Sequence, residues 1–81
     1  MPDLKERKIL WSNFLKDIAE INKEIIQRLS KDYKLSGGSI KNIIQFSWLL
    51  AKRNGTDISE KIILQGIRRE LNKDGKSIDS I

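Results

Sequence analysis

Residues 35–55 read LSGGSIKNIIQFSWLLAKRNG, a stretch with a helix start signal, a repeat of apolar residues and a stop signal. Ser36 is a residue type that commonly caps helix N-termini. Arg53 suits the negative end of a helix dipole, and Gly55 can take the left-handed conformation that ends a helix. The apolar spacing predicts a helix from about Gly37 to Arg53. Its apolar face comprises Ile40, Ile43, Ile44, Ser47, Leu50 and Ala51.

Two more helices are predicted before this stretch. The first starts after Pro2-Asp3, because Asp3 is a suitable N-cap and Glu6 follows three residues later, as in a capping box. The second starts near Glu20 or Asn22 and ends within residues 31–33. The apolar positions of the first are Leu4, Trp11, Phe14, Leu15 and Ile18, and those of the second are Ile21, Ile25, Ile26 and Leu29.

A fourth helix is predicted after the stretch, from Asp57 or Ser59 to a stop at Gly75. Its apolar face comprises Ile62, Ile63, Ile67 and Leu71, and Gly66 falls inside the same pattern. No strand-like alternation lasts more than a few residues. The fold class is therefore all-α, a small four-helix bundle, in which short connections make sequential helices antiparallel neighbours.

Composition excludes several classes of site. The 81 residues contain neither cysteine nor histidine, which removes disulfides, thiolate metal sites, and the usual general base and zinc ligand. The net charge of +5 comes from basic residues dispersed among eleven acidic ones, which favours an ordinary solvated surface over a nucleic-acid footprint. No apolar run approaches the roughly 20 residues that cross a bilayer. We expect a soluble, cytoplasmic protein without a membrane partner.

The sequence contains no catalytic set. It has no phosphate loop and no G-x-G-x-x-G motif. The acidic residues are expected to lie outside apolar segments, because burial within such a segment would raise the pKa of a carboxyl group. This chain by itself is therefore not expected to be an enzyme.

The paired glycines at the start of the third helix have two interpretations. They can provide the backbone freedom of a tight interhelical turn. Alternatively, Gly37 and Gly38 leave the free N–H groups of a helix start open to a flat ring or a phosphate. Composition alone favours the turn.

Two stretches together resemble the C-terminal lid, or small subdomain, of AAA+ ATPases, in particular the classical AAA branch. Residues 33–71 contain Ser36-Gly37-Gly38-Ser39-Ile40 where that family has Ser-Gly-Ala-Asp-Leu or a similar motif, and Ile58-Ser59 leads into the last helix. Residues 2–15, PDLKERKILWSNFL, are similar to the segment that joins the large ATPase subdomain to the lid. The matching positions there are Pro2, Asp3, Arg7, Leu10 and Trp11.

The resemblance implies a nucleotide-binding role. ATP would lie between the large subdomain and this lid, with Gly37 and Gly38 beside adenine and ribose. Ser39 occupies the position where many relatives carry the sensor-two arginine, so it cannot supply that charge. Lys41 is a candidate substitute for phosphate contact. Mg²⁺ would be bound by the large subdomain, which lies outside this chain.

The resemblance also implies partners and a domain plan. Residues 1–76 would be a lid cut from a larger ATP-hydrolysing protein, and residues 77–81 a flexible C-terminal tail. Its partners would be the large subdomain of the same chain and neighbouring protomers in a ring, expected to be a hexamer.

Two binding functions remain as alternatives. A small basic helical module would contact nucleic acid through Lys41, Arg53, Arg68 and Arg69. An adaptor would use aromatic anchors on a protein partner, namely Trp11, Phe46 and Trp48.

Overall fold

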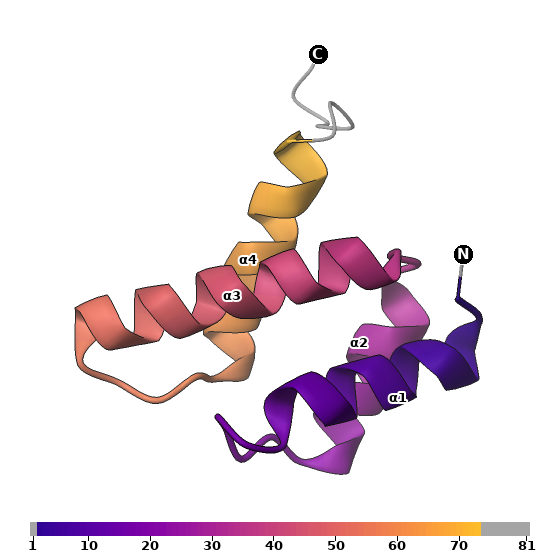
Figure 1. Ribbon diagram of the computed structural model, residues 1–81, viewed down its shortest axis with the longest axis horizontal. Coiled ribbons are helices and arrows are strands. Elements are labelled where there is room, and N and C mark those ends of the chain that lie inside the picture. The colour runs from indigo at the N-terminus through magenta and orange to yellow at the C-terminus, as the bar shows by residue number, and fades with distance from the viewer. Residues whose placement is uncertain (1, 74–81) are drawn as a thin grey trace.

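The computed structural model describes residues 2–73, which form four helices without strands (Figure 1). These 72 residues confirm the all-α, small four-helix bundle. The helices are α1 (Leu4–Leu15), α2 (Lys23–Asp32), α3 (Gly37–Asn54) and α4 (Glu60–Lys73). The predicted stop at Gly75 and the tail at 77–81 lie outside the described residues.

The predicted caps are present at the helix ends. Asp3 accepts a hydrogen bond from the Glu6 backbone N–H, and Glu6 accepts one from the Asp3 N–H, so the capping box is complete. Asn22 caps α2 and Ser36 caps α3, each by accepting the N–H three residues on. Gly55 ends α3 at φ 69°, in the left-handed region that favours glycine.

Ile18 was predicted to belong to the first helix, and this prediction is wrong. α1 ends at Leu15, so Ile18 lies in the turn that follows and is 39% exposed. Ile18 is not part of the core; it lines a surface hollow together with Ile44, Trp48 and Leu49 of α3.

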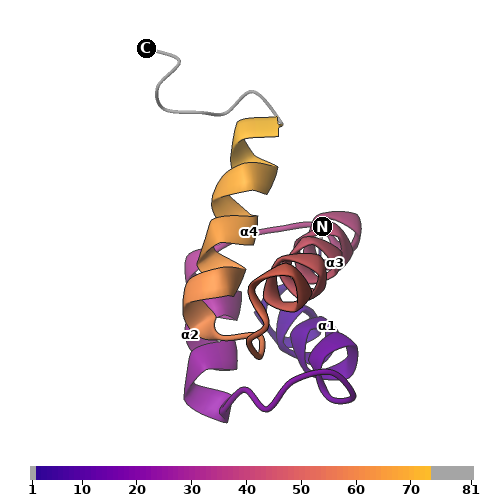
Figure 2. The same ribbon diagram turned by 90° about the vertical axis from the view of Figure 1, so that its left-hand side faces the viewer.

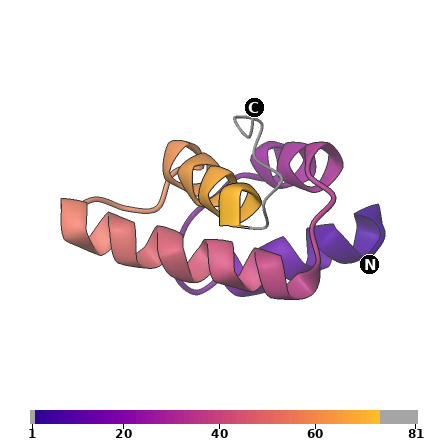
Figure 3. The ribbon, with the colours of Figure 1, turned by 90° about the horizontal axis from the view of Figure 1, so that it is seen from above.

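The four helices form two layers. Figures 2 and 3 show α1 and α3 in one layer and α2 and α4 in the other. α4 crosses behind the middle of α3 at a steep angle instead of lying along it (Figure 1).

The expected packing of sequential neighbours is only partly correct. α1 packs on α2 and α3 on α4, but the other main contact of α3 is with α1 rather than with α2. The extended residues between α2 and α3 carry the chain from one layer to the other.

The core lies between the two layers and is built mainly from isoleucine. Trp11 of α1, Ile40 of α3 and Ile63 of α4 are completely buried. The remaining buried apolar residues are Leu15, Leu29, Leu35, Ile43, Ile44, Ala51, Ile58, Ile62 and Ile67.

The crossing of α3 and α4 requires a glycine. A Cβ atom placed on Gly66 would lie 3.1 Å from Ile43 Cγ2, 3.2 Å from the Ile43 carbonyl oxygen and 3.2 Å from Ser47 Oγ. Ser47 donates to that same carbonyl at 2.7 Å, which holds its small side chain against the helix. Two small residues, Gly66 and Ser47, therefore let the helix backbones approach closely.

A buried arginine ties α1 to α2. Arg7 is only 7% exposed, and its Nε–H donates to the Ser30 carbonyl at 2.8 Å while Nη1 donates to the Pro2 carbonyl at 2.8 Å. Ser30 belongs to the last turn of α2, where carbonyl groups have no donor within the helix. The guanidinium therefore caps a neighbouring helix and lies at the negative end of its dipole.

Alanine substitutions at two glycines should have opposite effects on stability. Gly66→Ala places a Cβ against a backbone carbonyl, and we expect it to destabilise the chain by about 1–3 kcal/mol, as overpacking does. Gly38→Ala meets open space, and the higher helix propensity of alanine should leave stability unchanged or raise it by up to about 1 kcal/mol. Urea unfolding followed by circular dichroism measures both. Equal stability of the two variants would contradict the close crossing.

Lysine cannot replace the buried arginine. Arg7→Lys retains the charge but not the fork that reaches two carbonyl groups, so we expect a loss of about 2 kcal/mol in the free energy of unfolding. Arg28→Lys is the matched control, because Arg28 makes an exposed ion pair with Glu60 at 3.0 Å and should change stability by less than about 1 kcal/mol. Equal losses at the two positions would show that Arg7 does not act as a helix cap.

Candidate functional site

The start of α3 presents two bare residues on the first turn of the helix. Ser36 Oγ accepts the Ser39 N–H at 3.1 Å, and the Ser36 carbonyl accepts the Ile40 N–H. Gly37 and Gly38 are the first two helical residues, and an α-helix supplies no acceptor for N–H groups at these positions. Their N–H groups are therefore available to a ligand.

The backbone freedom of glycine does not explain this pair. Neither Gly37 nor Gly38 has a positive φ. A Cβ on Gly38 would meet nothing within 4 Å, and a Cβ on Gly37 would lie 3.7 Å from Leu10 Cδ1, an ordinary contact. The tight-turn interpretation favoured by composition is therefore not supported, because an alanine fits both positions.

Leu10 of α1 was not identified as a site residue from the sequence. It is half-buried, and its Cδ1 atom would lie 3.7 Å from a Cβ placed on Gly37. It places an apolar side chain beside the bare backbone. No spacing rule connects residues 10 and 37, since their proximity depends on the packing of α1 against α3.

The remaining predicted site residues lie on the same helix start. Ser39 is half-buried, and its N–H is used by the cap. Lys41 is exposed and lies three residues after Gly38, which places the two on one helix face. The first turn of α3 contains no acidic residue, so the helix dipole and Lys41 both favour a negative group there.

Glu70 contradicts the expectation that no acidic residue lies in an apolar segment. It is 4% exposed, because it follows Ile63 and Ile67 on the core face of α4. Its carboxylate lies 3.5 Å from Asn42 Nδ2 and 3.7 Å from Lys73 Nζ. Asn42 is one turn beyond Gly38, so Glu70 links α4 to the part of α3 that follows the glycines.

The residues of the two alternative functions are brought together only in part. Trp11 is completely buried and cannot anchor a partner, so its assignment as an adaptor residue is wrong. Lys41 and Arg53 are twelve residues apart on α3, about 18 Å along the axis. Arg68 and Arg69 are exposed on α4, and Arg69 stacks on Phe46 with its Cζ 5.0 Å from the ring centre. Arg53 and Arg69 therefore both adjoin Phe46, whereas Lys41 is separated from Arg53 by most of the length of α3.

Residues 2–73 show neither a cluster of metal ligands nor a membrane-spanning helix. No group of three or more acidic side chains there is placed to hold a metal ion. None of the four helices has the length and apolar character needed to span a membrane.

Comparisons of the chain with protein-family models, with curated proteins and with solved structures gave no match. The resemblance to AAA+ lids therefore rests on the sequence motifs at residues 2–11, 36–40 and 58–59.

Proposed function

We propose that this chain is the C-terminal lid of a cytoplasmic AAA+ ATPase, closing over ATP that is held by a large subdomain outside the chain. The observation that carries the proposal is the open space around Gly38, whose lack of a side chain the fold itself does not require. Glycine has a lower helix propensity than alanine, and no contact within residues 2–73 requires it at position 38, so we look for its reason in a ligand.

A nucleotide supplies that reason. A flat base and its ribose need a backbone without side chains, and Gly37 and Gly38 offer one next to the apolar Leu10 side chain. The helix dipole and Lys41 favour the negative charge of the phosphates. Mg²⁺ and the groups that hydrolyse ATP would come from the large subdomain.

The lid role links nucleotide state to motion. The bundle is held by one close helix crossing and one buried arginine cap, so it would move as a rigid unit. Rotation of this unit as ATP is bound and released would be passed to neighbouring protomers of a ring, a hexamer in our proposal.

A tryptophan at position 38 tests the proposal. In the full-length ATPase, Gly38→Trp should weaken binding of a fluorescent ATP analogue by at least tenfold, about 1.4 kcal/mol, because the indole occupies the place of the base. The same substitution in the 81-residue chain should preserve the helical circular dichroism spectrum, since nothing lies within 4 Å of the position.

Gln65→Trp is the matched control, because Gln65 is exposed on α4 away from the glycines. It should leave nucleotide affinity unchanged. Unchanged affinity in Gly38→Trp as well would remove the nucleotide assignment of Gly37 and Gly38.

A further inference from the structure

The C-terminal half of α3 presents large apolar side chains to solvent. Trp48 is 40% exposed and Leu49 is 61% exposed. Leu49 lines two separate surface hollows. One is also lined by Ile18, Ile44, Gln45 and Trp48, and the other by Phe46, Leu50 and Arg53. We call the surface formed by these two hollows the α3 outer surface.

Within residues 2–73, the charged groups that line the two hollows or stack on their aromatic rings are cations. Lys52 Nζ lies 4.8 Å from the centre of the Trp48 ring, and Arg69 Cζ lies 5.0 Å from the centre of the Phe46 ring. Arg53 lines the second hollow. Among residues 2–73, no acidic side chain lines either hollow, and the 18 residues of α3 contain no aspartate or glutamate.

Basic residues in the last turn of a helix suit its dipole, which accounts for Lys52 and Arg53 in isolation. The dipole of α3 does not account for Arg69, which belongs to α4 and stacks on Phe46 at the same surface. The dipole also does not explain why Trp48 and Leu49, which lie among these cations, are exposed. A surface with aromatic and aliphatic side chains inside a border of cations matches a partner of complementary shape and charge.

We propose that the α3 outer surface docks an acidic amphipathic segment of a protein partner. Large apolar side chains of that segment would fill the two hollows, and its carboxylates would pair with Lys52, Arg53 and Arg69. In the free protein the cations cover the aromatic rings, and they remain available for carboxylates because their hydrogen-bond donors are unused by the rings.

The charge around the surface favours a peptide over a membrane or a nucleic acid. Ile18 also lines a third hollow, which contains Asp17, Glu20 and Asp57. These carboxylates would repel a broad anionic surface that extends from the two hollows past Ile18. The docking surface is about 15 Å from Gly38 along α3, and it does not depend on the nucleotide role.

Selection of random 16-residue peptides displayed on phage, using the 81-residue chain as bait, tests the proposal. Selected peptides should be enriched in aspartate and glutamate and should carry large apolar residues at helical spacing. Their affinity should fall by at least about tenfold in Trp48→Ser/Leu49→Ser, the loss typical of removing central anchors. Both residues are exposed, so the fold should persist, and circular dichroism checks this.

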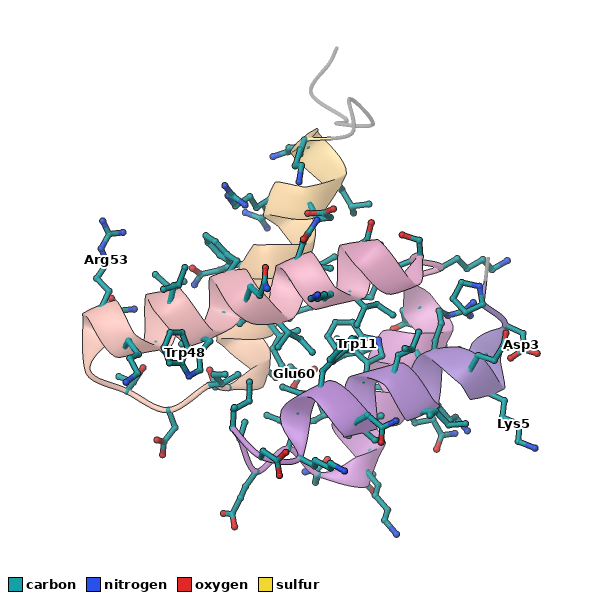
Figure 4. The ribbon with its side chains drawn as sticks, viewed as in Figure 1. Asp3, Lys5, Trp11, Trp48, Arg53 and Glu60 are labelled. Atoms are coloured by element: carbon teal, nitrogen blue, oxygen red, sulfur yellow. The ribbon has the colours of Figure 1, made fainter. Side chains whose placement is uncertain are left out.

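Charge reversal distinguishes peptide binding that depends on the cations of this surface from binding that depends only on the net charge of the chain. Lys52→Glu/Arg53→Glu should abolish binding of the acidic peptides and select basic ones instead. Lys5→Glu/Lys23→Glu changes the net charge equally at exposed positions of α1 and α2, and it should retain the acidic peptides. Figure 4 shows Lys5 at the opposite end of the molecule from Trp48 and Arg53.

Three results would overturn the proposal. The first is a set of peptides without acidic enrichment, and the second is equal loss of binding in the two charge-reversed variants. The third is tighter binding to phosphatidylserine vesicles, to duplex DNA or to a second copy of the chain than to the selected peptides.

Discussion

The close approach of α3 and α4 at Gly66 is the constraint on which the rest of the structure depends. Because no Cβ separates the helices there, the Gly66 backbone lies against Ile43 and Ser47 in the middle of α3. α4 therefore crosses α3 steeply and covers only its central turns (Figure 1). Both ends of α3 extend beyond the crossing, and each carries one of the surfaces to which we assign a function.

Three buried polar side chains, those of Arg7, Ser30 and Ser47, donate to backbone carbonyls, whereas the buried Glu70 carboxylate lies near Asn42 and Lys73. The hydroxyl groups of Ser30 and Ser47 donate to carbonyls one turn earlier in their own helices. Arg7 donates across helices to the end of α2. A short chain buries a limited apolar area, so an unsatisfied group among these would remove a large share of its stability. This requirement explains why Arg7 is buried although the chain is rich in exposed lysine.

The sequence predicted local features well because short-range physics determines them. The Asp3–Glu6 capping box, the Ser36 cap and the left-handed Gly55 each depend on a few neighbouring residues, and all three are confirmed. The pairing of α3 with α1 was not predicted, because it depends on how a four-residue connection changes layers. Glu70 is buried because it lies three residues after Ile67, on the core face of α4. The prediction from the sequence was wrong here because it considered the charge of Glu70 and not its position on the helix.

The candidate site was predicted in part for the same reason. Residues 36–41 are contiguous, so a motif identifies them together, whereas Leu10 joins them only through tertiary packing. What the sequence left open was whether the turn requires Gly37 and Gly38. The negative φ angles and the open space around Gly38 favour a ligand as the reason for the pair.

The mass of the native polypeptide tests the central claim most directly. An antibody raised against the 81-residue chain, used on a blot of a lysate from the source cells, measures it. The lid proposal requires an upstream large subdomain with a phosphate loop, and it predicts a band several times heavier than 9.4 kDa. A single band near 9.4 kDa would contradict the proposal, because that protein would lack the phosphate loop and the large subdomain that the proposal requires.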